Sequence, residues 1–260
     1  MKHALSENSY LDVQEYLRTR STILVPVGAI EQHGSYLPLG TDALLAEAVA
    51  HDCARAMGVM VAPLVPFGWS PQHMGGAGTI TLQSSTLSAV VEDISASLAH
   101  HGFRRIILVN GHRVANVPPL AIAAVRATQS TQALVVVADL ALLAHGEYTS
   151  SMNSGGGPMG HGDNYETSHL LHCRPDLVNL DLVDFQRPPS TKTHKNMSPY
   201  ADASRAAWWP ALPSSPSEHA DMADPEWITE ARGAELHAAI VRDLQALVAE
   251  VEAVELPQSH

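Results

Sequence analysis

The chain has 260 residues, of which 16% are charged and 45% are hydrophobic, and its formal net charge at pH 7 is −12. The acidic balance argues against a nucleic-acid partner, because binding to phosphates needs concentrated Lys and Arg, and no apolar run reaches the roughly 20 residues of a membrane span. The start of the chain lacks the apolar core of a signal peptide, so we expect a cytoplasmic protein. The charged fraction lies below the usual value of about a quarter, which indicates an interior-rich enzyme with surface hidden in a homo-oligomer.

Strand-like apolar runs alternate with helical patterns along the first 140 residues. Four strands are predicted from apolar runs, at 22–27, 59–65, 105–109 and 133–138. Three helices are predicted between them, starting near Thr41, from residue 84 or 85 to about 101, and over roughly 118–128. This order predicts an α/β fold with three αβα layers around a mostly parallel central sheet.

The pattern changes after residue 140. A Gly-rich run at 154–158 predicts a flexible segment, and helices are expected over 166–173 and from 225 to about 251. Residues 185–224 lack periodicity and are predicted to form an irregular, functional loop. We find no long linker in the first 140 residues, so a single domain over 1–260 is expected, with its core at about 20–250. Cys53 and Cys173 show no Cys-x-x-Cys pattern, which argues against a disulfide framework or a thiolate zinc site.

The residues after the first predicted strand include Glu31, His33 and Asp42. Open α/β sheets bind ligands at the carboxyl ends of their strands, and mixed oxygen and nitrogen donors suit Zn²⁺ or Mn²⁺. The three residues therefore indicate the start of a metal site. An exposed turn that collects these residue types is the alternative.

Two further groups of polar residues follow the next strands. Trp69, Ser70 and His73 lie beside a glycine-rich stretch that allows close backbone approach to a ligand, and they could line a substrate pocket or belong to a simple turn. The strand at 105–109 ends in a tight turn that presents His112, which would more often be structural if it stood alone.

His161 and Glu166 form the last group. Glu166 starts a predicted helix, where the helix dipole favours a carboxylate, so capping and metal ligation are both open. The sequence shows no structural duty for His161.

The order and spacing of these segments along the chain resemble those of the creatininase family (creatinine amidohydrolases and relatives). The resemblance covers roughly residues 20–250. The segments that carry the resemblance are Glu31-Gln32-His33-Gly34, Gly40-Thr41-Asp42, Gly78-Thr79, Asn110-Gly111-His112, and His161 with Glu166-Thr167-Ser168.

The resemblance implies an α/β three-layer fold with a two-metal site, commonly assembled as a homohexamer. Carried over to this sequence, it implies that Glu31 and His112 hold one divalent ion, that His33 and Glu166 hold the other, and that Asp42 bridges them. His161 matches the catalytic histidine of the family. Zinc or manganese is expected, and iron would also be compatible.

The chain departs from the pattern of creatinine-cleaving members after His112. Those members have a Glu there, close to a metal, whereas this chain reads Arg113-Val114-Ala115-Asn116. They also close over substrate with tryptophans that residues 140–160 of this chain lack. Creatinine is therefore not the expected substrate. Arg113 could pair with a substrate carboxylate or phosphate, or it could be a solvent-facing Arg at a strand end.

The expected activity is hydrolysis of a carbon–nitrogen bond in a small cyclic or unusual amide, by a metal-activated water. His161 would supply a proton to the leaving nitrogen. Two alternatives stay open. The chain could be a relative that deformylates or trims a peptide in cofactor biosynthesis, or an oligomeric metal-binding accessory protein without turnover.

Overall fold

The computed structural model describes residues 2–144, 146, 161–183, 197–198, 207–208 and 227–256. The predicted flexible segment at 154–158 lies outside the described residues, as does most of the predicted irregular loop at 185–224. Within that loop, only the two-residue strands β5 (Met197–Ser198) and β6 (Ala207–Trp208) are described, and they pair in parallel. No helix in the described part of the chain is both long and apolar enough to cross a membrane.

The centre of the fold is a four-stranded sheet in the order β2-β1-β3-β4. Its strands are β1 (Thr22–Val27), β2 (Met60–Val61), β3 (Arg105–Asn110) and β4 (Leu134–Asp139). All three pairings are parallel, with Val27 opposite Asn110 and Asn110 opposite Asp139. The carboxyl ends of β1, β3 and β4 therefore meet at one edge of the sheet.

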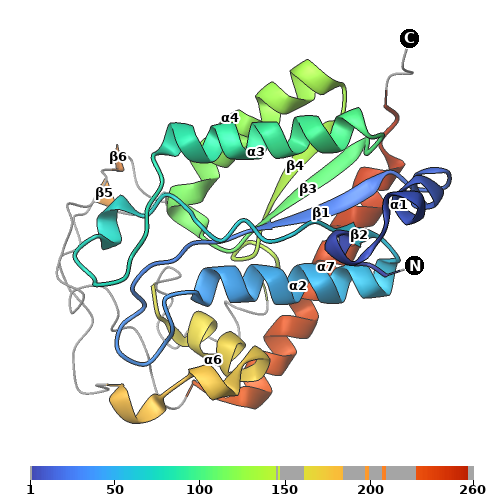
Figure 1. Ribbon diagram of the computed structural model, residues 1–260. Helices are drawn as coiled ribbons and strands as arrows, with labels where there is room; N and C mark the ends of the chain where they lie inside the picture. The colour runs from blue at the N-terminus through green and yellow to red at the C-terminus, as the bar shows by residue number, and fades with distance from the viewer. Residues whose placement is uncertain are drawn as a thin grey trace.

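Helices cover both faces of this sheet (Figure 1). One face carries α3 (Ser84–His100) and α4 (Arg113–Thr131), and the short α1 (Tyr10–Leu17) packs into the same core. The other face carries α2 (Thr41–Met57), α6 (Asn164–Cys173) and α7 (Glu230–Ala253). Short 3₁₀ turns complete the described chain, at Leu5–Glu7, Pro71–His73, Pro175–Leu177 and Leu180–Leu182.

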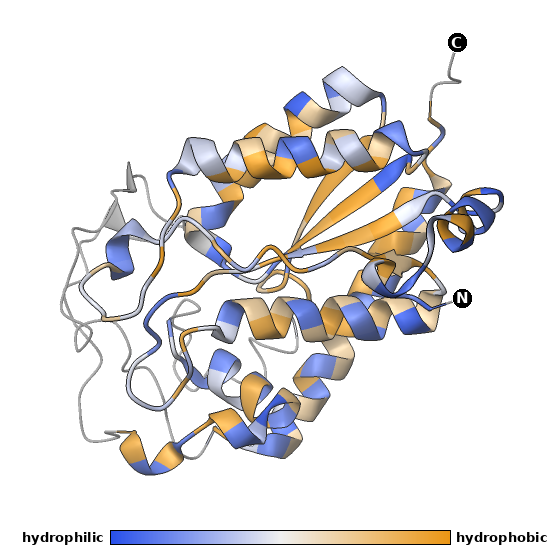
Figure 2. Cartoon of the chain, in the orientation of Figure 1, coloured by the Kyte–Doolittle hydropathy of each residue, from blue (hydrophilic) through white to orange (hydrophobic). Residues whose placement is uncertain are grey.

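Alternation along the strands divides the apolar residues between the two cores. Ile23 and Val25 pack toward α3 and α4, whereas Leu24 packs toward α2 and α7. Both faces of β1 are buried, which explains its unbroken apolar run. Figure 2 shows the strands as an apolar layer between helices with mixed surfaces.

Three predicted elements differ from the structure by several residues, and one of them is α7, which begins at Glu230 rather than at 225. The second strand is regular only over Met60–Val61, and Val65 adds an isolated bridge to Val27. Helix α4 begins at Arg113 rather than near Pro118, and both Pro118 and Pro119 lie inside it. The sequence prediction placed the prolines in the first turn, where a missing N–H is tolerated; the structure carries them one turn further in.

The start of α2 lies directly against the strand ends. A Cβ added to Gly111 would come within 2.2 Å of the backbone oxygen of Asp42, and one added to Gly28 would come within 2.3 Å of the Cα of Ala43. Glycine at these two positions therefore lets the first turn of α2 approach the ends of β1 and β3. That approach places Asp42 over the carboxyl edge of the sheet.

Candidate metal centre

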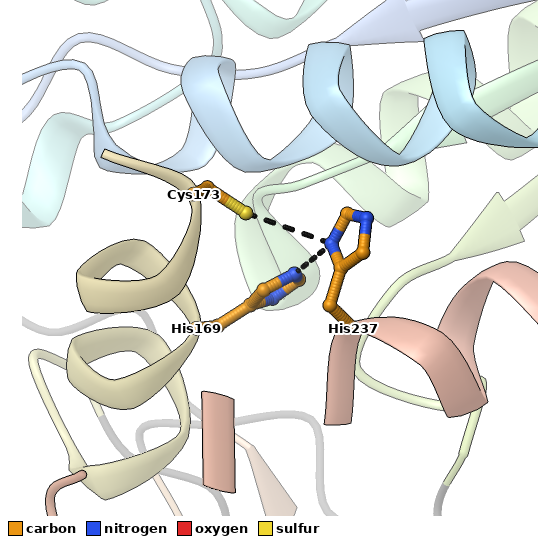
Figure 3. Close-up of side chains that lie close together, drawn as sticks. All are labelled: His169, Cys173 and His237. Atoms are coloured by element: carbon orange, nitrogen blue, oxygen red, sulfur yellow. Dashed lines mark hydrogen bonds between the residues drawn. The ribbon is translucent and has the colours of Figure 1, made fainter. Parts of the chain in front are cut away.

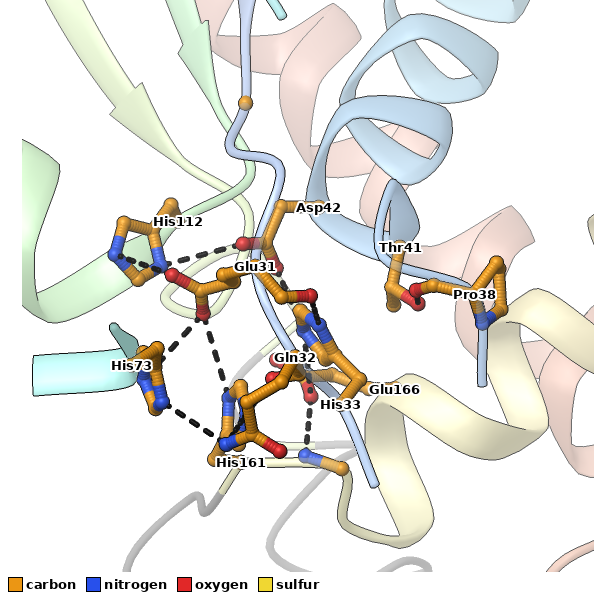
Figure 4. Close-up of polar contacts among 12 residues, drawn as sticks. Glu31, Gln32, His33, Pro38, Thr41, Asp42, His73, His112, His161 and Glu166 are labelled. Atoms are coloured by element: carbon orange, nitrogen blue, oxygen red, sulfur yellow. Dashed lines mark hydrogen bonds and ion pairs between the residues drawn. The ribbon is translucent and has the colours of Figure 1, made fainter. Parts of the chain in front are cut away.

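Asp42 lies between two histidines that come from different parts of the chain. Its Oδ1 is 3.3 Å from Nε2 of His33, and its Oδ2 is 3.3 Å from Nδ1 of His112. Asp42 stands in the first turn of α2, where the helix dipole stabilises a carboxylate. The Thr41 hydroxyl donates to the carbonyl of Pro38 and secures the turn that leads into the helix. Figure 4 shows the carboxylate between the two rings.

Glu31 completes one half of the site. Its Oε2 is 3.3 Å from Nε2 of His112, and the side chain is fully buried. His112 stands two residues after the end of β3, and the Asn110 side chain fixes its backbone with two hydrogen bonds. The His112 N–H donates to Asn110 Oδ1, and Asn110 Nδ2 donates to the His112 carbonyl. Glu31, Asp42 and His112 thus form one group with metal-ligand spacing.

His33 and Glu166 form the other half. Nε2 of His33 is 3.6 Å from Oε2 of Glu166, while Nδ1 of His33 lies 3.1 Å from the Glu31 carbonyl. Donation from Nδ1 to that carbonyl leaves the Nε2 lone pair directed at the carboxylates. Glu166 enters from the first turn of α6, which Asp163 caps through the Glu166 N–H.

Buried polar atoms without a hydrogen-bond partner gather at this place. They include both carboxylate oxygens of Glu31, Oδ2 of Asp42, Nε2 of His33 and Nε2 of His112. Orphaned buried polar groups are rare because each one loses its hydration without compensation. A cation among these atoms would satisfy all of them, so the residues fit divalent metal ions.

The titration of these groups reflects their crowding. Burial raises the pKa of Glu31 to about 7 and that of Glu166 to about 8. Burial opposes protonation of His33 and His112, but the neighbouring carboxylates outweigh it and raise their pKa values to about 10 and about 9. Burial also acts against ionisation of Asp42, yet the two imidazoles hold its pKa below the usual range. Three carboxylates in one buried volume need positive charge, which protons or metal ions can supply.

His161 lies against both halves of the site. Its Nδ1 is 3.5 Å from Oε1 of Glu31, and its Nε2 faces the carbonyl of Gln32. Donation from Nε2 to that carbonyl leaves the Nδ1 lone pair toward Glu31. Burial lowers the pKa of His161 well below its usual value, and the neighbouring His33 and His73 lower it further. The ring is therefore neutral at pH 7, and it is close enough to join two of the potential metal groups.

The predicted substrate residues fall in different places. His73 is buried in the site, with Nε2 3.5 Å from Oε1 of Glu31 and its ring stacked on His161 at 4.1 Å. Ser70 is fully buried beside Glu31. The Ser70 hydroxyl lowers the pKa of Glu31 against the larger effect of burial. Trp69 is half-buried and packs against the core beneath α3 and α4, which gives its ring a packing role. Its role in substrate binding stays a prediction.

Arg113 starts α4, and its charge acts on the buried Asp139 at the end of β4. Burial raises the pKa of Asp139 to about 6, and Arg113 opposes that rise. The guanidinium therefore has an acidic neighbour inside the protein, beside the carboxyl edge of the sheet. Its assignment to an anionic substrate group stays a prediction.

Sequence reasoning missed two amide side chains. Nε2 of Gln32 lies 3.0 Å from Nδ1 of His73, and the backbone carbonyl of Gln32 accepts from Nε2 of His161, so Gln32 contacts both rings. Asn116 accepts from the N–H of Trp69 and donates to the carbonyl of Gly28, which joins the loops after β1 and β2. The position of Gln32 between Glu31 and His33 was the available signal. For Asn116 the sequence offers no signal beyond its position shortly after His112.

Residues 6–248 match the family model Creatininase, described as creatinine amidohydrolase. A creatinine amidohydrolase of Pseudomonas putida is 34% identical over 183 residues, which cover 65% of this chain and 70% of that protein. A mycofactocin precursor peptide peptidase of Mycolicibacterium smegmatis is 35% identical over 170 residues, covering 61% of this chain and 60% of that protein.

The fold agrees with the sequence matches. A solved mutant creatininase of Zn-Zn type superposes with a TM-score of 0.81 at 25% identity, covering 96% of this chain and 98% of that one. The predicted three-layer fold and amidohydrolase class are thereby confirmed, and the chain belongs to the creatininase family.

Proposed function

We propose that this protein uses two divalent metal ions to hydrolyse a carbon–nitrogen bond in a small cyclic or unusual amide. The convergence of buried, unpartnered donor atoms of Glu31, His33, Asp42 and His112 carries the proposal. Glu31 and His112 would hold one ion, His33 and Glu166 the other, and Asp42 would lie between them. The donors suit zinc or manganese, and iron is also compatible. When bound, such ions acidify water and polarise the amide carbonyl.

His161 moves the proton in this proposal. Its neutral ring presents the Nδ1 lone pair toward Glu31, so this nitrogen takes a proton from the attacking water and passes it to the leaving nitrogen. The sequence by itself predicts only the second half of this transfer. A ring that is neutral before the reaction has a free Nδ1 lone pair, which supports the first half. The backbone carbonyl of Gln32 and the stacked ring of His73 hold the His161 ring in place.

The direct test combines metal analysis with a panel of amides and lactams. Purified protein should contain close to two divalent ions per chain and should release amine from at least one panel member. His33→Gln should abolish that release, whereas His100→Gln, at an exposed position at the end of α3, should not change it. Metal binding without turnover of any amide or peptide would favour a non-catalytic accessory protein.

A peptide substrate is the second candidate function, favoured by the 35% identity to the mycofactocin precursor peptide peptidase. It would use the same site and differ in the pocket around it. Short peptide amides and formylated peptides therefore belong in the panel. Faster cleavage of a peptide than of any small amide would select this candidate.

Specificity gives a further prediction. Creatinine should be a poor substrate, and an amide or lactam with an anionic group should be preferred. Arg113→Ala should raise the KM for that substrate roughly 10- to 100-fold, since a charge-assisted hydrogen bond contributes about 1.5–3 kcal/mol. Asp139→Asn is the control: it removes the charge of the acidic neighbour of Arg113 and leaves Arg113 itself in place. Efficient creatinine hydrolysis, or an Arg113→Ala variant with unchanged KM, would contradict this prediction.

The oligomeric state is a separate prediction. The low charged fraction and the family both suggest a homo-oligomer, and a hexamer is expected. Several apolar side chains are exposed on the single chain, including Ile122 and Val125 of α4, as an oligomer surface would require. Light scattering at working concentration should give about six times the chain mass of 27.8 kDa. A monomer mass would remove the proposal.

A further inference from the structure

A second cluster of metal-binding side chains lies between α6 and α7, outside the candidate metal centre. Nε2 of His169 is 2.8 Å from Nδ1 of His237, and Sγ of Cys173 is 3.5 Å from the same nitrogen. Figure 3 shows both groups pointing at this one atom. His169 is fully buried, His237 is 7% exposed and Cys173 is half-buried.

Hydrogen bonding alone leaves this cluster with more donors than acceptors. Nε2 of His237 lies 2.9 Å from Oδ2 of Asp52, so in the neutral ring Nε2 donates to the carboxylate and Nδ1 keeps its lone pair. The N–H of His169 and the S–H of Cys173 then compete for that single lone pair. Donation by Nε2 of His169 also leaves its Nδ1 as a buried acceptor without a partner.

The three ligand atoms have the spacing of a metal site, all lying within 4.8 Å of one another. Tetrahedral zinc with Zn–N near 2.0–2.1 Å and Zn–S near 2.3 Å needs N···N of about 3.3 Å and N···S of about 3.5 Å. The distance from Sγ of Cys173 to Nδ1 of His237 already fits, and the two imidazole nitrogens need to separate by only about 0.5 Å. The contact with Asp52 orients His237, as carboxylates do for metal-bound histidines.

The fold builds this cluster from local rules. His169 and Cys173 are four residues apart and share one face of α6. Gly233 allows α7 to approach α6, because a Cβ there would lie 1.9 Å from the backbone oxygen of Ser168. Cys173 is the last residue of α6, where the helix dipole favours a cation and disfavours an isolated thiolate.

We propose that His169, Cys173 and His237 bind one divalent transition-metal ion, such as Zn²⁺, that joins α6 to α7. A sulfur–metal bond forms as the S–H bond breaks, and the proton leaves to solvent; the fourth position is open to a water molecule. Burial raises the pKa of the Cys173 thiol to about 12, so metal binding would have to displace its proton.

This site would act on the candidate metal centre only through the backbone. Glu166, His169 and Cys173 stand at positions i, i+3 and i+7 of α6, so the same stripe of the helix carries a ligand of each site. An ion at the C-terminal end of α6 would fix the helix that presents Glu166. The proposal does not depend on the proposed function, because neither the ligands nor their geometry involve the substrate.

Cobalt is the probe, because a cobalt–thiolate bond gives a near-ultraviolet charge-transfer band that nitrogen and oxygen ligands do not give. The full chain is produced in zinc-free medium with Co²⁺ and its absorption spectrum is recorded. The band should be present in the wild type, lost in Cys173→Ser, and retained in Cys53→Ser, which replaces the buried cysteine of α2. Because the candidate metal centre has no thiolate, Asp42→Asn should also keep the band.

The wild-type spectrum decides the question even if a variant fails to fold. Cobalt-loaded wild type without the band, or a band that survives in Cys173→Ser, would overturn the site. A second readout is thermal stability: Zn²⁺ at 100 times its Kd should stabilise the wild type by roughly 2.7 kcal/mol more than a chain without the site. An equal zinc-induced rise in Tm for wild type and His237→Gln would likewise overturn it.

Discussion

Asp42→Ala should lose both ions of the candidate metal centre and at least about 10³-fold in kcat/KM. The carboxylate spans the site, with one oxygen 3.3 Å from His33 and the other 3.3 Å from His112. Its removal leaves each half one ligand short. Metal polarisation contributes several kcal/mol to such hydrolyses, and each 1.4 kcal/mol is a factor of ten in rate. Elemental analysis and amine release measure the two effects.

Two further variants complete this experiment. Asp42→Asn keeps the shape of the side chain but removes its charge, so it should also fall below two ions per chain. Asp93→Asn, at an exposed position on α3, should keep metal and activity. Full metal content in Asp42→Ala would show that Asp42 does not bridge.

His161→Ala should keep both ions and lose roughly 10²–10⁴-fold in kcat, the usual contribution of a positioned acid–base group. The five other donors already complete a dinuclear site, and the water that attacks the substrate needs an open position. The loss should shrink for anilides with electron-withdrawing groups, because their leaving nitrogen needs no proton. Single-turnover rates along such a series measure this dependence.

The same series separates three roles for His161. A metal ligand would take an ion with it when replaced. A residue that only supports the loop would lower Tm with near-normal kcat and an unchanged leaving-group dependence. His101→Ala, at an exposed position after α3, controls for the loss of a histidine as such.

Much of the fold followed from local patterns in the sequence. The apolar run of β1 and the alternation of strands with helices predicted a parallel sheet, because both signals depend on neighbours in the chain. The same order predicted that Glu31, His33 and His112 approach one another, since the carboxyl ends of parallel strands meet at one edge. The start of α4 is not a local signal: Pro118 and Pro119 are typical of a first helical turn, yet α4 begins at Arg113.

The tertiary structure alone decided the contacts between residues far apart in sequence. His73 has no periodic signal, yet the loop after β2 brings it onto His161. Arg113 resembles a free surface charge in the sequence, and the end of β4 supplies Asp139 as its neighbour.

The second cluster is the clearest case of this limit. Cys173 has no second cysteine near it in the chain, so the sequence argues against a thiolate metal site. The packing of α7 on α6 brings His237, 64 residues away, within 3.5 Å of its sulfur. The sequence by itself thus determined the elements and the donors at the strand ends, because periodicity and strand polarity are local. The folded structure determined which distant side chains share a buried volume, because that depends on helix packing, such as the close approach at Gly233, which no local pattern records.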